Sequence, residues 1–485
     1  MPLHIVLRAI AIIACSFALS THAWAKDDDN AAATAEQNTK RRVAELVEKS
    51  APRPFALLEA GATTIYRGAT LIDGTGASPR SGMAIVVTGQ KIADILPAAN
   101  IPADMLNRAH VVELDGRYVI PGLIDEHQHI ATPPNPVVAQ SRLRREIYGG
   151  VTAIRIMGDD LRLVSEVSRQ ALAGEIPGPD VYMAAIFAGP EFFKDPRVAA
   201  DSLGYESGAA PWMQMIDENT DLALAIARAR GAGATAVKTY AYLSADLIRR
   251  IAEEAHRQNM MVWSHAALVP AKPSEVLAAG VDSMSHICMI PYEAMNEQAL
   301  RNKGANGRTK MQVDAVRKGN NAQVARLFRE MKRRNVILDA TGLTCSNMEQ
   351  FMVTPENRKA ATGLSAKLLR QAHSEGVEIG AGTDSDGTSE SQYPAIDDEL
   401  EFLVEMTGMS PAEALRAATV TAARATGVEN IMGTVTPGKL ANFVVLKKNP
   451  LSDVKNIRTV VMTVKRGVRY NRADFDAADE PCTKQ

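Results

Sequence analysis

Apolar and polar positions along the chain follow two different patterns, and the first is typical of strands joined by turns. Between residues 62 and 114, short apolar or alternating runs are separated by Gly, Pro, Asn or Asp, as expected for strands and their turns. The predicted strands cover residues 62–72, 83–87, 91–96 and 110–114. Because no long helical pattern interrupts these runs, we expect a small antiparallel β unit.

The second pattern begins at Val119, where apolar runs of 4–7 residues alternate with helical patterns of 10–15 residues. In the helix predicted over residues 245–258, for example, Leu247, Ile248 and Ile251 fall on one face. Repeated strand–helix units form parallel sheets. About eight such units fit between residues 119 and 430, which favours a closed (β/α)8 barrel over an open sheet.

Strand patterns return after Val428, over residues 443–446 and 459–464. Neither β block is large enough to bury a core alone, so we predict one small β-sandwich built from both ends of the chain. The predicted fold class is therefore α/β, a TIM-like barrel inserted into a composite β-sandwich. The expected domains are the β-sandwich at 59–118 and 431–472, the barrel at 119–430 and a C-terminal tail at 473–485.

The N-terminal residues have the pattern of an export signal. Arg8 ends a short positive start, residues 9–19 are apolar, and Ala23-Trp24-Ala25 provides small residues at a cleavage site. We therefore predict a signal peptide over residues 1–25 and a periplasmic or secreted protein. A membrane anchor is disfavoured, because the apolar stretch is only about half of a bilayer span. Residues 26–58 are charged and Ala-rich and predict a leader with one helix at 40–49.

The charge balance excludes some classes of partner. The chain holds 54 Lys and Arg against 56 Asp and Glu. This near-zero net charge does not favour binding of the whole chain to nucleic acid or anionic lipid. No apolar run approaches the ~18 residues of a membrane span, and we expect no stable membrane insertion after cleavage. The charge balance leaves assembly into a homo-oligomer open.

Three cysteines remain after the predicted cleavage, namely Cys288, Cys345 and Cys482. An odd number leaves at least one thiol unpaired within the chain. We expect Cys288 and Cys345 to be buried small apolar residues. A single disulfide in an oxidising compartment is the alternative.

Candidate chemistry gathers at the predicted strand ends. His127 and His129 end the first barrel strand, and residues at i and i+2 share a strand face. Both rings can therefore point into the barrel mouth, where such barrels place their sites. Later strands end in or carry Lys238, His265, His286 and Asp384. Each residue alone has an ordinary structural explanation, but together they would converge on one ring of the barrel.

Several stretches carry a family resemblance. They are Pro121-Gly122-Leu123-Ile124-Asp125-x-His127-x-His129, Gly150 to Arg155, Val237-Lys238, Ser264-His265-Ala266, Gly382-Thr383-Asp384-Ser385 and Pro437 to Ala441. In these motifs and their order, over roughly residues 62–470, the chain resembles the amidohydrolase superfamily, in the imidazolonepropionase-like branch that includes metal-dependent dipeptidases. One departure is Asn442, where the family usually has Asp.

The resemblance implies a site with two divalent metal ions, of which Zn²⁺ is the expected species. Its implied ligands are His127, His129, Lys238, His265, His286 and Asp384, with Lys238 carboxylated to bridge the ions. Imidazole and carboxylate ligands suit zinc. A metal-activated hydroxide would then attack the carbonyl, and Asp384 would pass its proton to the leaving nitrogen. Tyr240 is expected either to donate a hydrogen bond to the carbonyl or substrate, or to serve as a wall residue.

The expected reaction is hydrolysis of a C–N amide bond in a dipeptide, an N-acyl amino acid or a cyclic amide. Deamination on the same metal site is the closest enzymatic alternative. A non-catalytic exported binding protein is the alternative of another class, and the six filled ligand positions argue against it.

A basic segment at residues 301–334 has two interpretations. It holds eleven Lys or Arg against Asp314 and Glu330, and Val324, Leu327, Phe328 and Met331 form one apolar helical stripe. A basic rim over the barrel mouth would attract a substrate carboxylate. A solvated helix face is the alternative.

Overall fold

The computed structural model describes residues 62–295, 320–352, 361–385 and 391–476, together with Gln37 and Val316. The predicted signal peptide, the leader apart from Gln37, the helix at 40–49 and Cys482 lie outside these residues. None of the described helices is long and apolar enough to cross a bilayer.

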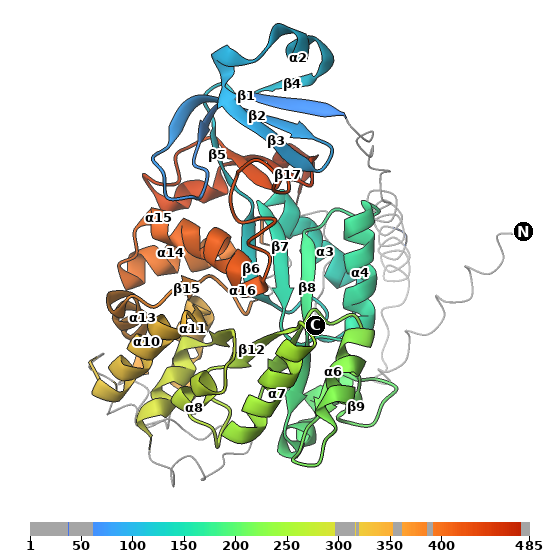
Figure 1. Cartoon of the computed structure of the whole chain (residues 1–485), viewed down its shortest axis with the longest axis vertical. Helices are drawn as coiled ribbons and strands as arrows, with labels where there is room; N and C mark the ends of the chain where they lie inside the picture. Colours follow the sequence, from blue (N-terminus) through green and yellow to red (C-terminus); the bar gives the residue numbers. More distant parts are fainter. Residues whose placement is uncertain are drawn as a thin grey trace, which may run out of the picture. The chain divides into compact units, whose positions relative to one another are not determined.

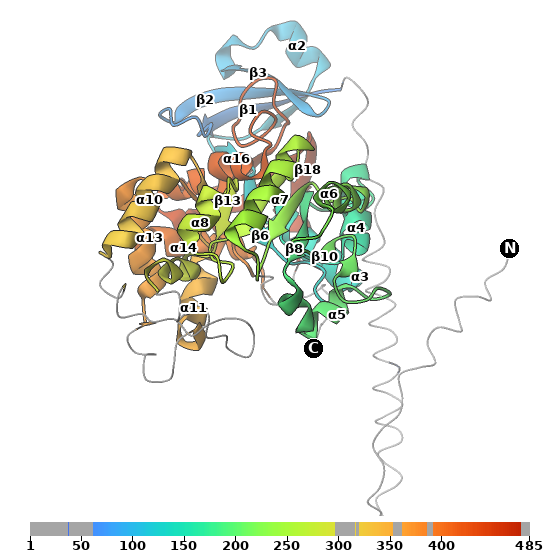
Figure 2. The same ribbon diagram turned by 60° about the horizontal axis from the view of Figure 1, so that its bottom comes forward.

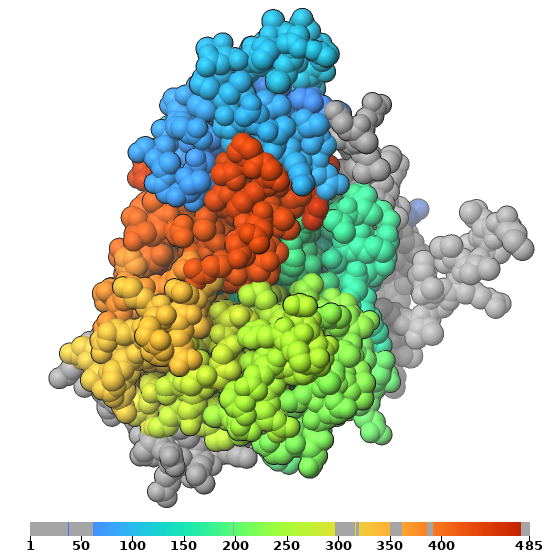
Figure 3. Space-filling view, viewed as in Figure 1, coloured from blue at the N-terminus to red at the C-terminus, as the bar shows by residue number. Residues whose placement is uncertain are grey.

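Strands from both ends of the chain form one mixed sheet of eight strands, in the order β18-β17-β16-β5-β1-β2-β3 with β4 beside β1. The strands are β1 (Thr63–Leu71), β2 (Arg80–Thr88), β3 (Lys91–Pro97), β4 (His110–Glu113), β5 (Tyr118–Pro121), β16 (Phe443–Leu446), β17 (Val460–Lys465) and β18 (Val468–Asn471). The prediction that strands from both termini combine in one small β unit is thus confirmed, and the unit is one mixed sheet. Figure 3 shows its blue and red segments adjoining on one face.

The prediction that the N-terminal β block is antiparallel is wrong in part. β1 pairs with β2 and β2 with β3 in antiparallel fashion, but β4 and β5 run parallel to β1. The connection from β3 to β4 passes through η2 (Ala98–Asn100) and α2 (Ala103–Arg108). That excursion returns the chain in the direction of β1, and the alternation of apolar residues does not encode it.

Eight parallel strands form the barrel. They are β6 (Leu123–Gln128), β7 (Val151–Ile156), β8 (Asp180–Ala188), β11 (Ala236–Thr239), β12 (Met261–His265), β13 (Ser283–Ser285), β14 (Ile337–Asp339) and β15 (Ile379–Gly380). Between the last and the first strand, Glu126 N–H donates to Ala381 O at 3.2 Å and Asp384 N–H to His127 O at 2.8 Å. These bonds bring the barrel close to closure, as the sequence pattern predicts.

Helices surround these strands, with α10, α11, α13 and α14 on one side and α3, α4 and α6 on another (Figures 1 and 2). The larger helices are α3 (Pro136–Tyr148), α4 (Leu161–Ala173), α6 (Leu222–Gly231), α7 (Ala245–Arg257), α10 (Ala322–Arg334), α11 (Gly342–Met352), α13 (Leu364–Glu375) and α14 (Ala395–Thr407). Shorter elements are η3 (Pro190–Lys194), α5 (Arg197–Asp201), β9 (Ala209–Ala210), β10 (Met213–Met215), α8 (Pro273–Ala278), η4 (Ile287–Ala294), α15 (Pro411–Arg416), η6 (Ala417–Thr421), α16 (Ala422–Thr426), η7 (Val454–Arg458) and η8 (Arg472–Asp474).

Helix α7 illustrates why the sequence folds this way. The Ser244 hydroxyl accepts a hydrogen bond from Leu247 N–H and caps the first turn, which satisfies a donor that the helix itself leaves unpaired. The apolar face predicted from the sequence is buried, and Ile248 and Ile251 are fully inaccessible to solvent. Packing of such faces against the strands fixes where each strand ends, and these ends carry the candidate site.

Buried hydrogen bonds join the eight-stranded sheet to the barrel. Lys465 Nζ donates to Ala171 O and Gly178 O at 3.1 and 2.8 Å. Asn442, the departure from the family pattern, is also buried at this junction, where its Oδ1 accepts from Arg466 N–H at 2.8 Å. Its role is therefore structural and lies apart from the barrel mouth.

Candidate metal centre and its pocket

Six of the seven predicted site residues line one cavity of about 230 Å³ at the carboxyl ends of the barrel strands. These six are His127, His129, Tyr240, His265, His286 and Asp384. They come from β6 and β12 and from the segments after β6, β11, β13 and β15. The seventh, Lys238, is fully buried on β11, and its Nζ donates to Ser285 Oγ at 2.8 Å.

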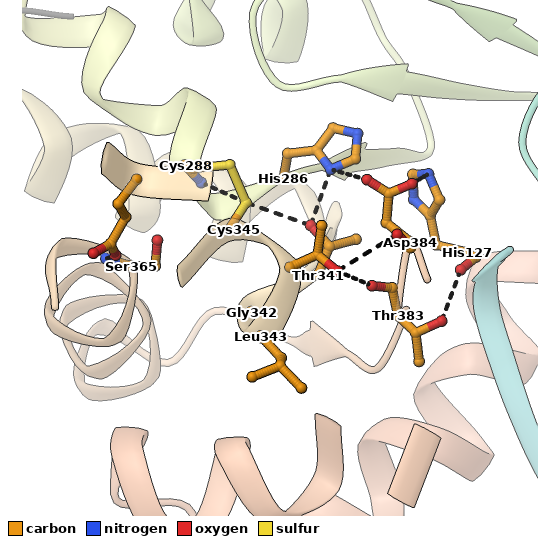
Figure 4. The surroundings of a disulfide bond; sticks show 12 residues. His127, His286, Cys288, Thr341, Gly342, Leu343, Cys345, Ser365, Thr383 and Asp384 are labelled. Atoms are coloured by element: carbon orange, nitrogen blue, oxygen red, sulfur yellow. Dashed lines mark hydrogen bonds and ion pairs between the residues drawn. A yellow bond between two sulfur atoms is a disulfide. The ribbon is translucent and has the colours of Figure 1, made fainter. Parts of the chain in front are cut away.

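Asp384 lies at the centre of the histidines. Its Oδ1 is 3.5 Å from His127 Nε2 and 3.4 Å from His129 Nε2, and its Oδ2 is 3.8 Å from His286 Nδ1. Figure 4 shows the carboxylate between the rings of His127 and His286. One donor atom each from His127, His286 and Asp384 lies within 4.8 Å of the others. Imidazole nitrogens and a carboxylate oxygen at this spacing suit a zinc-type ion.

Two further carboxylates hold the histidine rings from behind. Asp339, at the end of β14, is 2.7 Å from His127 Nδ1, and Asp159 is 2.8 Å from His129 Nδ1. Both rings therefore turn their Nε2 atoms toward Asp384. A carboxylate behind a histidine is the usual means of fixing its tautomer and orientation for a metal.

Neither carboxylate is among the site residues predicted from the sequence. Asp339 ends the apolar run Val336-Ile337-Leu338, which is the same signal that identified Asp384. Asp159 follows β7 and also accepts from the N–H groups of Ile130 and Ala131, each at 2.7 Å. A strand-end criterion applied to every acidic residue would have found Asp339.

The centre of the barrel beneath the pocket is charged. Arg155 is fully buried over the Trp263 ring, at 4.4 Å from its centroid, and its Nη2 donates to Asp339 Oδ2 at 3.2 Å. Gly382 allows Asp339 and His127 to lie close to its backbone, because a Cβ at position 382 would overlap Asp339 Oδ1 and the Cβ of His127. Arg155 thus neutralises the carboxylate that orients His127.

The histidines and the carboxylates shift one another's pKa values. Burial favours the neutral form of Asp384, but His127, His129 and His286 keep its pKa below the usual range. Burial lowers the pKa values of His127 and His286, the latter strongly. Burial also acts to lower the pKa of His129, but the hydrogen bonds of this ring to Asp159 and Asp384 raise that pKa well above the usual value. The site therefore keeps Asp384 ionised.

Burial also lowers the pKa of Lys238 to about 7. The nearby Asp339 and Asp384 oppose this shift, and Arg155 adds to it. A substantial fraction of the amine is therefore neutral near pH 7.

Three residues of the site have left-handed backbone conformations although none is glycine. The φ angles are 76° at His286, 41° at Thr341 and 49° at Asp384. The β-branched Thr341 is a marked exception, because its side chain crowds the backbone there. Its hydroxyl lies 2.9 Å from His286 Nδ1 (Figure 4). Such strained positions concentrate at functional sites, where the surrounding contacts maintain them.

Cys288 and Cys345 form a disulfide (Figure 4). The expectation of two separate buried thiols is therefore wrong, although both residues are buried, and the alternative of one disulfide holds. Cys288 follows β13 and Cys345 follows β14. The bond joins segments 57 positions apart, a pairing that spacing along the sequence cannot reveal.

Aromatic rings form a continuous row along the pocket. The Tyr240 ring is 4.0 Å from that of His265, His265 is 4.7 Å from His286, and His286 is 4.8 Å from His127, all between centroids. Phe192 lies 4.7 Å from Tyr240 on its other side. The half-buried Tyr240 is therefore a wall residue at the edge of the site, and its phenol remains a candidate donor.

The described part of the basic segment lies on α10 and contributes no residue to the described lining of the pocket. Its charges meet acidic partners, since Arg333 binds Glu330 at 2.6 Å and Arg329 binds Glu375 at 3.2 Å. Residues 320–334 therefore match the solvated helix face rather than the rim. Residues 301–319, apart from Val316, lie outside the described structure.

Comparison with known proteins identifies the family of this chain. Residues 118–469 match the model of the amidohydrolase family. The chain is 26% identical to ochratoxinase of Aspergillus niger over 446 residues, which cover 82% of this chain and 83% of that protein.

Solved structures share the fold. The crystal structure of A. niger ochratoxinase superposes with a TM-score of 0.66 at 22% identity, covering 85% of this chain and 96% of the other. A Xaa-Pro dipeptidase with bound methionine gives 0.65 at 19% identity, covering 84% and 100%. The family match spans most of the chain, and the described fold agrees with it. This chain therefore belongs to the amidohydrolase family and is a hydrolase.

Proposed function

We propose that this chain is an exported, metal-dependent hydrolase that cleaves a C–N amide bond in a small molecule. The observation that carries the proposal is the Asp384 carboxylate within 3.5 Å of His127 and His129, whose far ring nitrogens contact Asp339 and Asp159. The names of two relatives, an ochratoxinase and a Xaa-Pro dipeptidase, support a small substrate. A dipeptide, an N-acyl amino acid and a cyclic amide are the candidate classes.

The donor set fits divalent metal ions, and Zn²⁺ is the proposed species. His127, His129, His265, His286 and Asp384 would hold two ions together with Lys238. Lys238 is the misfit in this set, because a buried ammonium beside histidines is costly. Carboxylation would convert it into an anion suited to bridge the ions.

Bound ions would polarise the scissile carbonyl and lower the pKa of water. The residues of this chain perform the remaining steps. Asp384 accepts a proton from the attacking water and transfers it to the leaving nitrogen. Thr341 and Asp339 keep His286 and His127 in place by their hydrogen bonds. Tyr240 lies within the pocket wall, where its phenol can donate to the substrate.

Export remains part of the proposal and rests on the pattern of residues 1–25. The disulfide between Cys288 and Cys345 supports it, because such bonds persist mainly in oxidising compartments. Intact-mass analysis of the protein from its native compartment should give a chain that begins at Lys26. A mass that retains residues 1–25 would contradict export with cleavage.

The reaction is tested by zinc-loaded protein on a panel of dipeptides, N-acyl amino acids and cyclic amides, with amidines included to test for deamination. The expected result is release of an amine that depends on metal and stops on chelation. Ammonia from an amidine substrate without amide cleavage would favour deamination. Bound metal without turnover on any substrate would favour the binding protein.

A further inference from the structure

The wall of the pocket that does not carry metal-binding candidates is rich in sulfur. Cys288 and Met289 contribute from η4, and Cys345 and Met348 contribute from α11. We call these four residues the sulfur wall. We propose that it binds an uncharged, preferably aromatic group of the substrate next to the scissile amide. This inference rests on the proposed hydrolase function and narrows its substrate class.

Helix geometry accounts for half of the wall. Thr344, Cys345 and Met348 are spaced i, i+1 and i+4 on α11, so they share the helix face that meets the pocket. Met348 is 39% exposed, although it is a large apolar side chain. An apolar side chain left uncovered at the mouth of a polar site is available to a ligand.

The charges of the pocket favour a neutral group. Among the described lining residues, the ionisable side chains are the four histidines, Tyr240 and Asp384. Neither Lys nor Arg occurs in that lining, so the described part of the sulfur wall offers a substrate carboxylate no Lys or Arg to pair with. Thioether sulfurs form favourable contacts with aromatic rings and adapt to their shape. Aromatic groups are therefore the best match for this wall.

Several contacts hold the sulfur wall in place before any ligand binds. The disulfide joins its two halves, and Cys288 N–H lies 3.2 Å from Cys345 Sγ. The buried Glu399 carboxylate accepts from Gly342 N–H at 2.7 Å and Leu343 N–H at 2.9 Å, at the start of α11. A wall fixed in this way loses little freedom on binding and can discriminate by shape.

The test uses three hydroxamates that share one metal-binding group and differ in the acyl group. Benzohydroxamate is aromatic, butyrohydroxamate is small and neutral, and succinohydroxamate adds a carboxylate to the same short chain. Calorimetric binding to the zinc-loaded wild type should rank benzo- above butyro- above succinohydroxamate. Contact with the wall should strengthen benzohydroxamate about tenfold over butyrohydroxamate, as expected for partial burial of an apolar ring.

Three variants test whether this preference arises from the sulfur wall. Met289→Ala with Met348→Ala should remove most of the preference for benzohydroxamate, whereas Met406→Ala, an exposed methionine on α14, should retain it. Met348→Lys should improve binding of succinohydroxamate. Equal or tighter binding of succinohydroxamate by the wild type, or a preference unchanged in the double variant, would overturn the inference while leaving the hydrolase intact. If none of the three binds, the proposed metal site and this inference fail together.

Discussion

The centre of the small sheet and the centre of the barrel are equally inaccessible to solvent but opposite in chemistry. The sheet core is apolar and aromatic, built from Tyr66, Ile85, Phe443 and Val464. The barrel centre holds charged side chains, namely Glu126, Arg155, Lys238 and Asp339. The rings of Tyr66 and Phe443 meet edge to face at 4.9 Å, whereas Glu126 has both carboxylate oxygens buried with no hydrogen-bond partner among the described residues.

This difference separates residues that maintain the fold from residues that maintain the site. Buried ion pairs rarely stabilise a protein more than apolar packing of the same volume would. The charged centre therefore needs another explanation, and its contacts provide one. Asp339 orients His127 and is neutralised by Arg155. Departures from ordinary core chemistry are expected where function requires them.

The largest effect is expected at Asp384. Asn retains a carbonyl oxygen that can coordinate weakly, but it cannot accept a proton. Asp384→Asn should keep much of its metal and lose activity by roughly 10²–10⁴-fold, as is typical when a general acid–base group is removed. Metal content and kcat are measured on the same samples, with the exposed Asp104→Asn of α2 as the matched control. Near-normal kcat in the metallated variant would exclude the proton-transfer role.

One buried position in each core, aromatic in the sheet and charged in the barrel, compares the stability that the two cores provide. Phe443→Ala in the sheet and Arg155→Met in the barrel should each reduce the free energy of unfolding by about 3–5 kcal/mol. The first loses packing, and the second leaves Asp339 uncompensated. Urea denaturation measures both losses. Arg155→Met should also weaken metal binding, whereas Phe443→Ala should not. Wild-type metal affinity in Arg155→Met would contradict the assignment of the charged barrel centre to the site.

A smaller effect on the metal is expected from Asp339→Asn. The amide can still contact His127 Nδ1, but it no longer supplies the negative charge that makes the ring a better ligand. Metal affinity should fall about 10–100-fold, the range for such supporting carboxylates. Competition with a fluorescent zinc chelator measures it. Asp282→Asn, which removes the carboxylate facing the surface residue His256, should leave the affinity unchanged.

The last effect concerns the pH dependence of stability. Burial raises the pKa of Glu399 to about 8, although its hydrogen bonds from Leu343 and Gly342 oppose this. The folded state then holds this proton more tightly than the unfolded state, where the pKa is about 4.3. The resulting stability is complete below that value and is lost as the pH rises through about 8. Glu399→Gln should flatten the decline between pH 5 and 8 in urea melts, and an unchanged slope would contradict this assignment.

Periodicity was sufficient to predict the barrel, the composite β domain and the strand ends that bear the histidines. The helix expected at 245–258 occurs as α7, which spans Ala245–Arg257. Strand direction was not predictable, because β4 returns parallel to β1 through a short helix. The family resemblance identified residues in the pocket wall, but their supporting groups depend on distant pairs. Asp339 meets His127 across 212 positions, and Cys345 meets Cys288 across 57.

The central claim is that the charged residues in the barrel centre support a metal site in the pocket above them. The number of metal ions bound per chain tests this claim most directly. Wild-type protein reconstituted with zinc and bicarbonate is analysed by elemental mass spectrometry beside Lys238→Ala. We expect two metal ions per chain in the wild type, a gain from bicarbonate, and loss of one or both ions in Lys238→Ala. One ion per active chain, indifferent to bicarbonate and to Lys238, would contradict the bridged centre.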